Sequence, residues 1–261
     1  MNYSNLTLFP QYATLYINVL FCIFCLNTTF FGRKRGHTMA YESLHDIFLQ
    51  YPADSVGERV CNSIRTAIIN HQIPPGERLV EAKVAQALHV SITPVRYAFT
   101  QLANEGLIDV IPYCGTYVKT LSKQFVREVC EVRALLECAA AESAFEKITY
   151  DDIMALQEQV TLLCRPVGSF RTTHEACMAD TRFHDIIFER SGNKTLIQFW
   201  QILRARMEFI TSFTKERDDC ELQMQRHSVL VDDLIAKDKE KFLRDLHAHC
   251  IEPNYEFFSE D

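Results

Sequence analysis

Four side chains in the C-terminal half of the chain have the types and spacing to bind one metal ion. Asp180 and His184 stand four residues apart, so on a helix they face the same side and can reach one atom. His227 and His249 each fall within the apolar stripe of a predicted helix, whereas His247 falls off that stripe and is left out. One carboxylate and three imidazoles suit a divalent transition metal, zinc first, with nickel, iron or manganese as alternatives. On spacing alone, the three histidines could instead be hydrogen-bonded core residues.

These candidate ligands need a set of packed helices to bring them together. In residues 122–261 glycine and proline are rare and apolar residues recur every three or four positions, which predicts an all-α domain of about six helices. The candidate ligands lie on the third, fifth and sixth of them. The predicted helices cover about 124–146, 150–164, a segment through Asp180 that ends near Ser191, 194–214, a segment from about 218, and a segment after 238.

Residues 54–121 carry a different pattern, which begins with three helices. Ser55 and Glu58 have the spacing of a capping box, so a helix begins there, and the turn 74–76 ends it. A short helix over about 81–88 follows. Pro94 suits the first position of a third helix, because its missing N–H would have no partner there, and Ser91 or Thr93 can cap it.

Two extended runs, 107–111 and 116–120, follow the third helix and flank the turn Tyr113-Cys114-Gly115. Three helices followed by a β-hairpin make a winged helix-turn-helix, in which the second helix of the motif lies in the major groove of DNA.

Three motifs in this segment resemble the DNA-binding domain of the GntR family of bacterial transcription regulators. They are Pro75-Gly76-Glu77-Arg78-Leu79, Val90-Ser91-x-Thr93-Pro94-Val95-Arg96, and Leu102-Ala103-x-Glu105-Gly106-Leu107. The resemblance implies DNA contacts from Arg78, Ser91, Thr93 and Arg96, with Gly115 letting the wing tip approach the minor groove. The alternatives are solvated charges for the two arginines and helix capping for the two hydroxyls.

The chain also departs from that family at positions that bear on sequence preference. Ile92 stands where arginine is usual, and Cys114 stands where the wing is usually basic. The loss of a bidentate arginine removes about 1–3 kcal/mol of base discrimination. Between Asp54 and Lys119 the basic and acidic residues balance, so this domain is net neutral. These departures concern operator specificity more than fold.

The C-terminal pattern is similar to the ligand-binding domain of the FadR-like (FCD) subgroup of the same family. The similarity rests on Asp180-x-x-Phe183-His184, then Ser191-Gly192-Asn193, then His227 and His249. In many members the corresponding aspartate and three histidines bind a metal, which helps to hold a small carboxylate effector. The implied architecture is mainly α: an N-terminal winged helix-turn-helix, of three helices plus a β-hairpin wing, followed by an all-α helical-bundle ligand-binding domain.

Two further residues come from the same resemblance as candidate effector contacts. Arg133, in the motif Arg133-x-x-x-Glu137, could clamp an effector carboxylate with both guanidinium nitrogens, and Asn193 could line the same pocket. The alternatives are a buried structural ion pair for Arg133 and a helix cap for Asn193.

Composition excludes several classes of protein. A chain of 261 residues with 48% hydrophobic residues, 8 Gly and 8 Pro is neither fibrous nor disordered. Its net charge of −7 excludes a chain that binds nucleic acid over its whole surface, but not one with a local DNA-reading face. Apart from Cys22 and Cys25, the ten cysteines show no paired spacing, which favours reduced thiols in a cytoplasmic protein.

The first 38 residues, part of an N-terminal extension over 1–53, do not resemble the rest. The apolar run 12–31 and the basic cluster 32–36 have the form of a short membrane anchor with a cytoplasmic flank. The other interpretation is that translation was assigned too early and the protein begins at Met39.

The predicted function is a cytoplasmic, ligand-responsive transcription regulator without catalytic residues. A homodimer would bind a palindromic DNA operator, and a small carboxylate bound beside the metal would change the spacing of its two DNA-binding domains. One alternative is a metal-dependent enzyme acting on a small carboxylate, which no nucleophile–base motif in the sequence supports. The other is a membrane-tethered regulator, which requires the 12–31 anchor; otherwise no membrane partner is expected.

Overall fold

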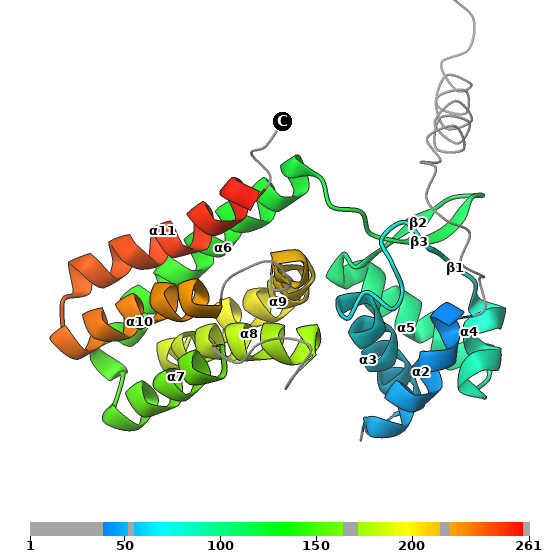
Figure 1. Cartoon of the computed structure of the whole chain (residues 1–261), viewed down its shortest axis with the longest axis horizontal. Helices are drawn as coiled ribbons and strands as arrows, with labels where there is room; N and C mark the ends of the chain where they lie inside the picture. The colour runs from blue at the N-terminus through cyan, green and yellow to red at the C-terminus, as the bar shows by residue number, and fades with distance from the viewer. Residues whose placement is uncertain (1–38, 52–54, 164–171, 215–219, 258–261) are drawn as a thin grey trace, which may run out of the picture.

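The computed structural model describes residues 39–51, 55–163, 172–214 and 220–257, which form two lobes side by side (Figure 1). The predicted 12–31 anchor and the pair Cys22 and Cys25 lie outside the described residues. Among the residues that are described, no helix has the length and apolar character needed to cross a bilayer.

The N-terminal lobe is a winged helix-turn-helix, as the sequence predicts. A three-stranded antiparallel sheet has the strand order β1-β3-β2 and forms the wing beside the helices (Figure 1). The short strand β1 was not predicted, because two residues carry no alternating pattern. The elements are α2 (Met39–Gln50), α3 (Val56–Ile69), β1 (Arg78–Leu79), α4 (Glu81–Leu88), α5 (Ile92–Glu105), β2 (Ile108–Ile111) and β3 (Gly115–Val118).

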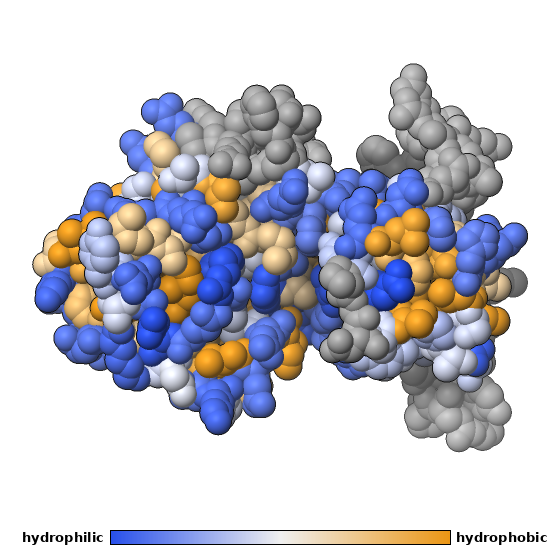
Figure 2. Space-filling view, turned by 90° about the horizontal axis from the view of Figure 1, so that it is seen from below, coloured by the Kyte–Doolittle hydropathy of each residue, from blue (hydrophilic) through white to orange (hydrophobic). Residues whose placement is uncertain are grey.

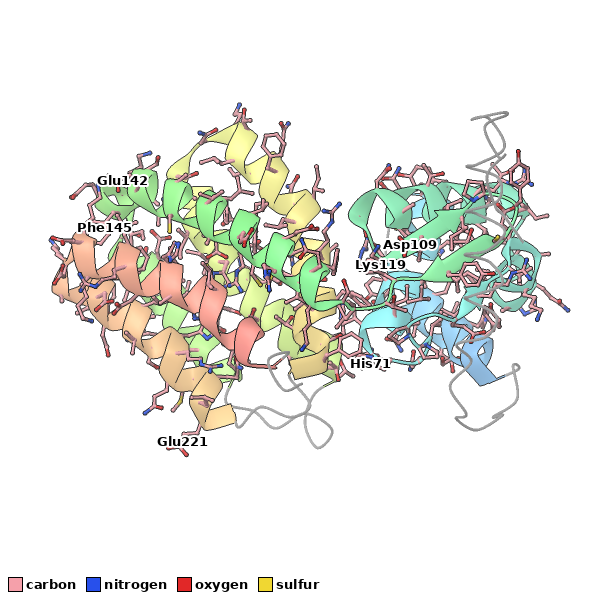
Figure 3. All side chains as sticks on the ribbon, turned by 90° about the horizontal axis from the view of Figure 1, so that it is seen from above. His71, Asp109, Lys119, Glu142, Phe145 and Glu221 are labelled. Atoms are coloured by element: carbon pink, nitrogen blue, oxygen red, sulfur yellow. The ribbon has the colours of Figure 1, made fainter. Side chains whose placement is uncertain are left out.

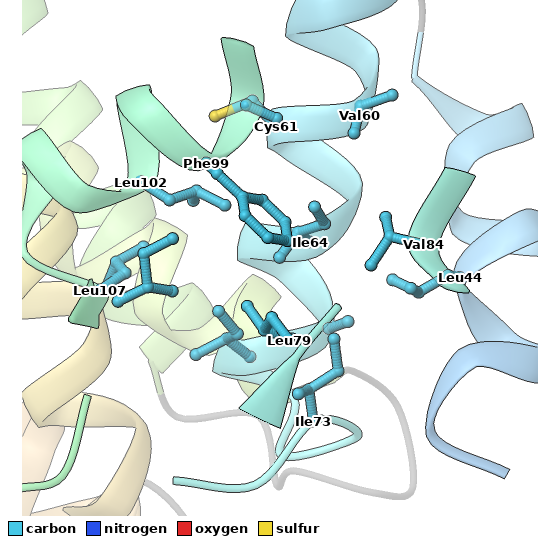
Figure 4. Close-up of a cluster of buried hydrophobic side chains, with 14 of the residues drawn as sticks. Leu44, Val60, Cys61, Ile64, Ile73, Leu79, Val84, Phe99, Leu102 and Leu107 are labelled. Atoms are coloured by element: carbon cyan, nitrogen blue, oxygen red, sulfur yellow. The ribbon is translucent and has the colours of Figure 1, made fainter. Parts of the chain in front are cut away.

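Helix α2 lies in a segment for which the sequence predicted no element. Its residues Leu44, Ile47 and Phe48 are buried in the core of the lobe, where Leu44 lies near Val84 of α4 (Figure 4). The Tyr41 hydroxyl donates a hydrogen bond to the carbonyl of Arg78, at 3.3 Å. The spacing of these apolar residues is itself helical and could have predicted α2. The helix is thus part of the lobe that holds the predicted DNA contacts.

The C-terminal lobe consists, in its described part, of six α-helices, which agrees with the predicted all-α domain. Helix α8 lies at its centre and packs on α6, α7 and α9, while α11 runs along α6 (Figure 1). The helices are α6 (Lys123–Ala144), α7 (Tyr150–Leu163), α8 (Thr173–Ser191), α9 (Lys194–Thr214), α10 (Cys220–Ala236) and α11 (Lys239–Phe257), with a 3-10 turn at Phe145–Lys147.

Local signals explain where α8 begins and ends. Thr172 and Glu175 form a reciprocal capping box at its start. At its end Gly192 takes a left-handed conformation, with φ 70°, which glycine adopts without steric cost. The two ends fix the register of the helix that carries Asp180 and His184.

The two lobes contact each other through α8 and α9. Cys177, Ala205 and Phe209 are buried in the hydrophobic cluster of the N-terminal lobe. The Arg206 Nε donates to the carbonyl of Glu105 at 3.1 Å, at the C-terminus of α5. His71 lies at the same boundary, where its Nε2 is 3.2 Å from the carbonyl oxygen of Ser212 (Figure 3). The helix that holds two candidate metal ligands therefore also touches the N-terminal lobe.

A polar cleft lies between the lobes and is lined by Arg65, Glu105, His174, Gln201 and Arg204, among others. Arg65 forms a bidentate pair with Glu105, with nitrogen–oxygen distances of 2.9 and 2.5 Å. Arg204 pairs with Asp185 and Glu208, each at 3.0 Å. Each arginine of the cleft is therefore paired with at least one carboxylate.

Candidate metal centre and nucleic-acid interface

Three of the predicted metal ligands converge inside the C-terminal lobe. His184 comes from α8, His227 from α10 and His249 from α11, and one ligating nitrogen from each lies within 4.8 Å of the other two. His184 and His227 are buried, and His249 is partly buried. Asp180, one turn before His184, places its Oδ1 3.4 Å from the Nε2 of His227. His247 is exposed on α11.

The three rings are held at different angles around one small space. The ring centroids of His227 and His249 are 4.5 Å apart, and that of His184 lies 5.2 Å from His249 and 5.7 Å from His227. The Nε2 atoms of His184 and His249 are 3.4 Å apart. The Nδ1 of His227 lies 2.9 Å from the carbonyl oxygen of Gln223, to which it can donate. With Nδ1 donating to this carbonyl, Nε2 carries the lone pair of the ring, which is the arrangement typical of a metal-binding histidine.

Glu137 of α6 supports His184 from the opposite side. Its Oε2 lies 2.7 Å from the Nδ1 of His184, and its Oε1 accepts a hydrogen bond from the Nε of Arg133 at 2.6 Å. Burial alone would raise the pKa of Glu137, but Arg133 and then His184 outweigh it and lower the pKa to about 2. The carboxylate is therefore ionised, and it lies against the Nδ1 edge of the His184 ring.

Arg133 stands at the nitrogen of His184 that faces the other rings. Its Nη2 is 2.7 Å from the Nε2 of His184, and the arginine side chain is almost fully buried. A metal ion bound to this Nε2 therefore requires the guanidinium to leave that nitrogen. Of the two alternatives that the sequence left for Arg133, the structure shows the buried ion pair with Glu137, and the contact with an effector carboxylate stays a prediction.

The donor set fits a divalent transition metal. Burial, followed by the nearby His227 and His184, holds the pKa of His249 well below its ordinary value, so its imidazole is neutral and can ligate. Its Nδ1 is a buried nitrogen that has no hydrogen-bond partner among the described residues. Neutral imidazoles with a carboxylate at the rim are the ligand types that such ions prefer.

Asn193 lies apart from this cluster. It is exposed between α8 and α9, and its Oδ1 accepts hydrogen bonds from the backbone N–H groups of Thr195 and Leu196, at 3.1 and 3.2 Å. It therefore caps α9, which was the alternative to a pocket-lining role.

The predicted recognition helix, α5, begins two residues earlier than the sequence suggested. Ser91 is its N-cap, with φ −71° and ψ 167°, so Ile92 is the first helical residue and Pro94 the third. Thr93 consequently lies inside the first turn instead of capping it. The Ser91 hydroxyl makes no capping hydrogen bond. Both hydroxyl residues are exposed, which leaves them available to DNA phosphates.

Arg96 lies one turn further along α5 and is exposed. Its Nε donates to the Oε2 of Glu81 on α4 at 2.8 Å, and 69% of its side chain is accessible. A pair this exposed contributes about 0–1 kcal/mol, so a phosphate or base edge can replace Glu81.

The guanidinium of Arg78 on β1 lies beside Gly115 on β3, although the strand register pairs Arg78 with Tyr117. A Cβ atom on Gly115 would lie 3.0 Å from the Nε of Arg78 and 3.2 Å from its Nη2. Gly115 also has φ +126°, which favours glycine. The absence of a side chain at Gly115 thus lets the guanidinium lie against the hairpin, so these two predicted DNA contacts form one unit.

Comparison with known proteins identifies the two lobes. Residues 56–118 match the family described as bacterial regulatory proteins, gntR family, and residues 128–252 match the FCD domain. The HTH-type transcriptional repressor RspR of Escherichia coli (strain K12) is 35% identical over 109 residues, which are 42% of this chain and 48% of RspR. The chain therefore spans about half the length of that relative.

Two other similarities extend over both lobes. The gluconate operon transcriptional repressor of Bacillus licheniformis is 26% identical over 199 residues, 74% of this chain and 81% of the repressor. The solved structure of E. coli McbR/YncC aligns with a TM-score of 0.62 and 25% identity, and covers 79% of this chain and 98% of its own.

Proposed function

The chain belongs to the GntR family of bacterial transcription regulators and carries an FCD domain, and from this we propose that it is a metal-dependent sensor of a small carboxylate. Its family and its relatives are transcription regulators rather than enzymes. In the proposal, residues 54–121 bind an operator and residues 122–261 bind the metal and the effector.

The observation that carries this proposal is the convergence of His184, His227 and His249 inside the FCD domain. Glu137 behind His184 and the Gln223 carbonyl behind His227 orient two of the rings, as is typical of metal-binding histidines. A divalent metal held there, zinc first, would supply positive charge and an open position for a carboxylate oxygen. Asp180 is the proposed fourth ligand, because it reaches His227 from the same face of α8 as His184.

Arg133 supports a carboxylate as the class of effector. Its guanidinium is buried beside the imidazoles, and the Nη2 edge points at His184. When that nitrogen of His184 is taken by the metal, the guanidinium edge is free to bind a carboxylate in bidentate fashion. One relative is a repressor of a gluconate operon, and gluconate is a small carboxylate.

The route from effector to DNA runs along α8. This helix carries Asp180 and His184 at the metal site, and Cys177 of the same helix lies in the core of the DNA-reading lobe. A shift of α8 on ligand binding would therefore move the contact between the lobes. In a cytoplasmic homodimer this would change the spacing of two winged helices on a palindromic operator.

Zinc titration of metal-stripped full-length protein, followed by calorimetry, tests the proposal. Binding at about one ion per chain is expected in the wild type and is expected to be lost in His227→Ala. The His247→Ala variant, changed at an exposed histidine of α11, should bind as the wild type does. A wild type that takes up no divalent metal would overturn the proposed metal-dependent sensor. Failure of the full-length protein to bind any DNA duplex in a separate binding assay would instead overturn its role as a transcription regulator.

A further inference from the structure

An aliphatic side chain stands exposed at the start of the recognition helix. Ile92, the first residue of α5, keeps 42% of its surface accessible. Hydrophobic side chains interrupt the hydrophilic surface of the N-terminal lobe on the face that Figure 2 shows. Burial of this side chain against a partner would remove apolar surface from water, which is favourable.

Packing within the lobe accounts for the other large exposed residue of α5 but not for Ile92. The ring of Tyr97 lies against Gly57 of α3, where a Cβ atom would be 2.6 Å from its Cδ1. Tyr97 also lines a hollow with Val56, Val90 and Pro94, and Ile92 is not among the residues that line it. Ser91 and Thr93, on either side of Ile92, also line this hollow, so Ile92 is the one residue of the run 90–94 that does not.

The neighbours of Ile92 are residues that can contact DNA. Ser91 and Thr93 flank it and are exposed, and Arg96 follows four residues later on the same face of the helix. In helix-turn-helix proteins the N-terminal residues of this helix reach the base edges in the major groove. Ile92 thus lies inside a surface that otherwise offers hydroxyl and guanidinium donors.

An isoleucine side chain can neither donate nor accept a hydrogen bond. In the major groove the four bases present hydrogen-bonding groups, and one apolar group, the C5 methyl of thymine. A donor or acceptor placed opposite Ile92 would lose its water without gaining a partner. The methyl group is therefore the base-edge feature that an exposed isoleucine favours.

We propose that Ile92 is a specificity-determining residue that selects thymine in each half-site by contact with its C5 methyl. The inference rests on the DNA-reading role of the N-terminal lobe. Residues four apart on a helix are about 5–6 Å apart at Cβ, and successive bases are about 3.4 Å apart. The selected thymine is therefore one or two base pairs from the position that Arg96 contacts.

The test starts from duplexes selected by the full-length protein from a pool with about 20–30 random base pairs. In the selected duplex, each thymine of a half-site is replaced in turn by deoxyuridine, which removes only the methyl group. At one position the wild-type protein should bind the uracil duplex about fourfold more weakly, the ratio expected for the loss of one buried methyl group.

Three variants show which side chain reads the methyl. Ile92→Ala should bind the thymine and uracil duplexes equally. Leu49→Ala, which shortens an exposed aliphatic side chain on α2, should keep the fourfold preference. Thr93→Ser, which removes the neighbouring methyl group, should keep it too.

The inference is overturned if the wild type shows no thymine preference at any half-site position, or if Ile92→Ala retains it. If the preference is lost in Thr93→Ser but kept in Ile92→Ala, the contact belongs to Thr93, and this result would also overturn the inference. A wild type that selects no duplex from the pool would overturn the DNA-reading role itself, which is a separate result.

Discussion

The Oε2 of Glu137 lies 2.7 Å from the Nδ1 of His184, although the two residues belong to different helices. The same carboxylate holds Arg133 through its other oxygen. Glu137 therefore contacts the Nδ1 edge of His184, and it also anchors the arginine that stands at the Nε2 of that ring. The candidate metal ligand and the candidate effector contact are positioned by one buried anion.

Glu137→Gln should weaken metal binding without changing a proposed ligand. The glutamine keeps the size of the side chain but removes the charge that orients and polarises His184, so zinc affinity should fall about 10–100-fold. Calorimetric titration of stripped protein measures it. Glu142→Gln, on an exposed part of the same helix, is the matched control. Wild-type affinity in Glu137→Gln would show that the contact is structural only.

The two histidines of α11 should behave differently although they are two residues apart. His249→Ala removes an imidazole from the cluster, whereas His247 is exposed on the surface of the helix. Elemental analysis of the purified variants should therefore find a loss of metal in His249→Ala and a wild-type content in His247→Ala. Equal losses in both variants would contradict the ligand assignment.

His174 should make the stability of the chain depend on pH. Burial between the lobes, and next the charge of Arg65, lower its pKa to about 4 from an ordinary value of 6.5. Between these pH values the unfolded chain binds a proton that the folded chain does not, so the free energy of unfolding falls as pH decreases from 6.5 to 4. The expected loss is about 1–3 kcal/mol.

Urea denaturation at several pH values measures this effect. The His174→Asn variant should lose less stability than the wild type over the same range, because its side chain does not titrate. Gln201→Asn, at another residue that lines the same cleft, should keep the wild-type slope. If His174→Asn has the slope of the wild type, the histidine is not the group responsible.

Local signals in the sequence predicted most of the helices. The period of apolar residues and the caps indicated α4 and α9 with their observed bounds, and the turn at Gly192 marked the end of α8. The facing of Asp180 and His184 follows from their spacing of four. The cap at Asn193 could have been predicted more firmly, because Asx residues commonly bond the backbone two or three residues on.

Contacts between distant helices could not be predicted in the same way. A periodic pattern says which face of a helix is buried, but not which residue of another helix lies opposite it. The contact between Glu137 and His184 and the place of Arg133 at the Nε2 of His184 depend on how α6 packs against α8. Strand β1 depends likewise on pairing with β3, since two residues carry no pattern of their own.

Gly115→Ala should weaken DNA binding by moving Arg78. An alanine Cβ would lie 3.0 Å from the Nε of Arg78, and φ +126° is strained for any residue with a side chain. Because the guanidinium is flexible it moves aside, so the fold should persist with a loss of about 1–3 kcal/mol. Fluorescence anisotropy on a selected duplex measures binding, and thermal denaturation checks the fold.

Arg78→Ala shows whether the effect of Gly115→Ala on DNA affinity is exerted through Arg78. If Gly115→Ala acts through Arg78, the variant with both changes should bind DNA with about the affinity of whichever single variant binds less tightly. Strictly additive losses would mean that Gly115 contacts DNA independently of Arg78.

Arg96 and Glu81 should have opposite effects on DNA binding. The pair is exposed, so Arg96→Ala should lower stability by less than about 1 kcal/mol. It should nevertheless weaken binding about 10–100-fold if Arg96 contacts a base edge, and it should reduce the salt slope by about one if Arg96 contacts a phosphate. Glu81→Gln frees the arginine and removes a negative charge near DNA, so it should tighten binding by about two- to fivefold. Anisotropy titrations at several salt concentrations measure both effects.

The variant with both changes should bind DNA as Arg96→Ala does, because Glu81 then has no arginine to restrain. If Glu81→Gln still tightens binding when Arg96 is absent, Glu81 acts by repelling DNA directly.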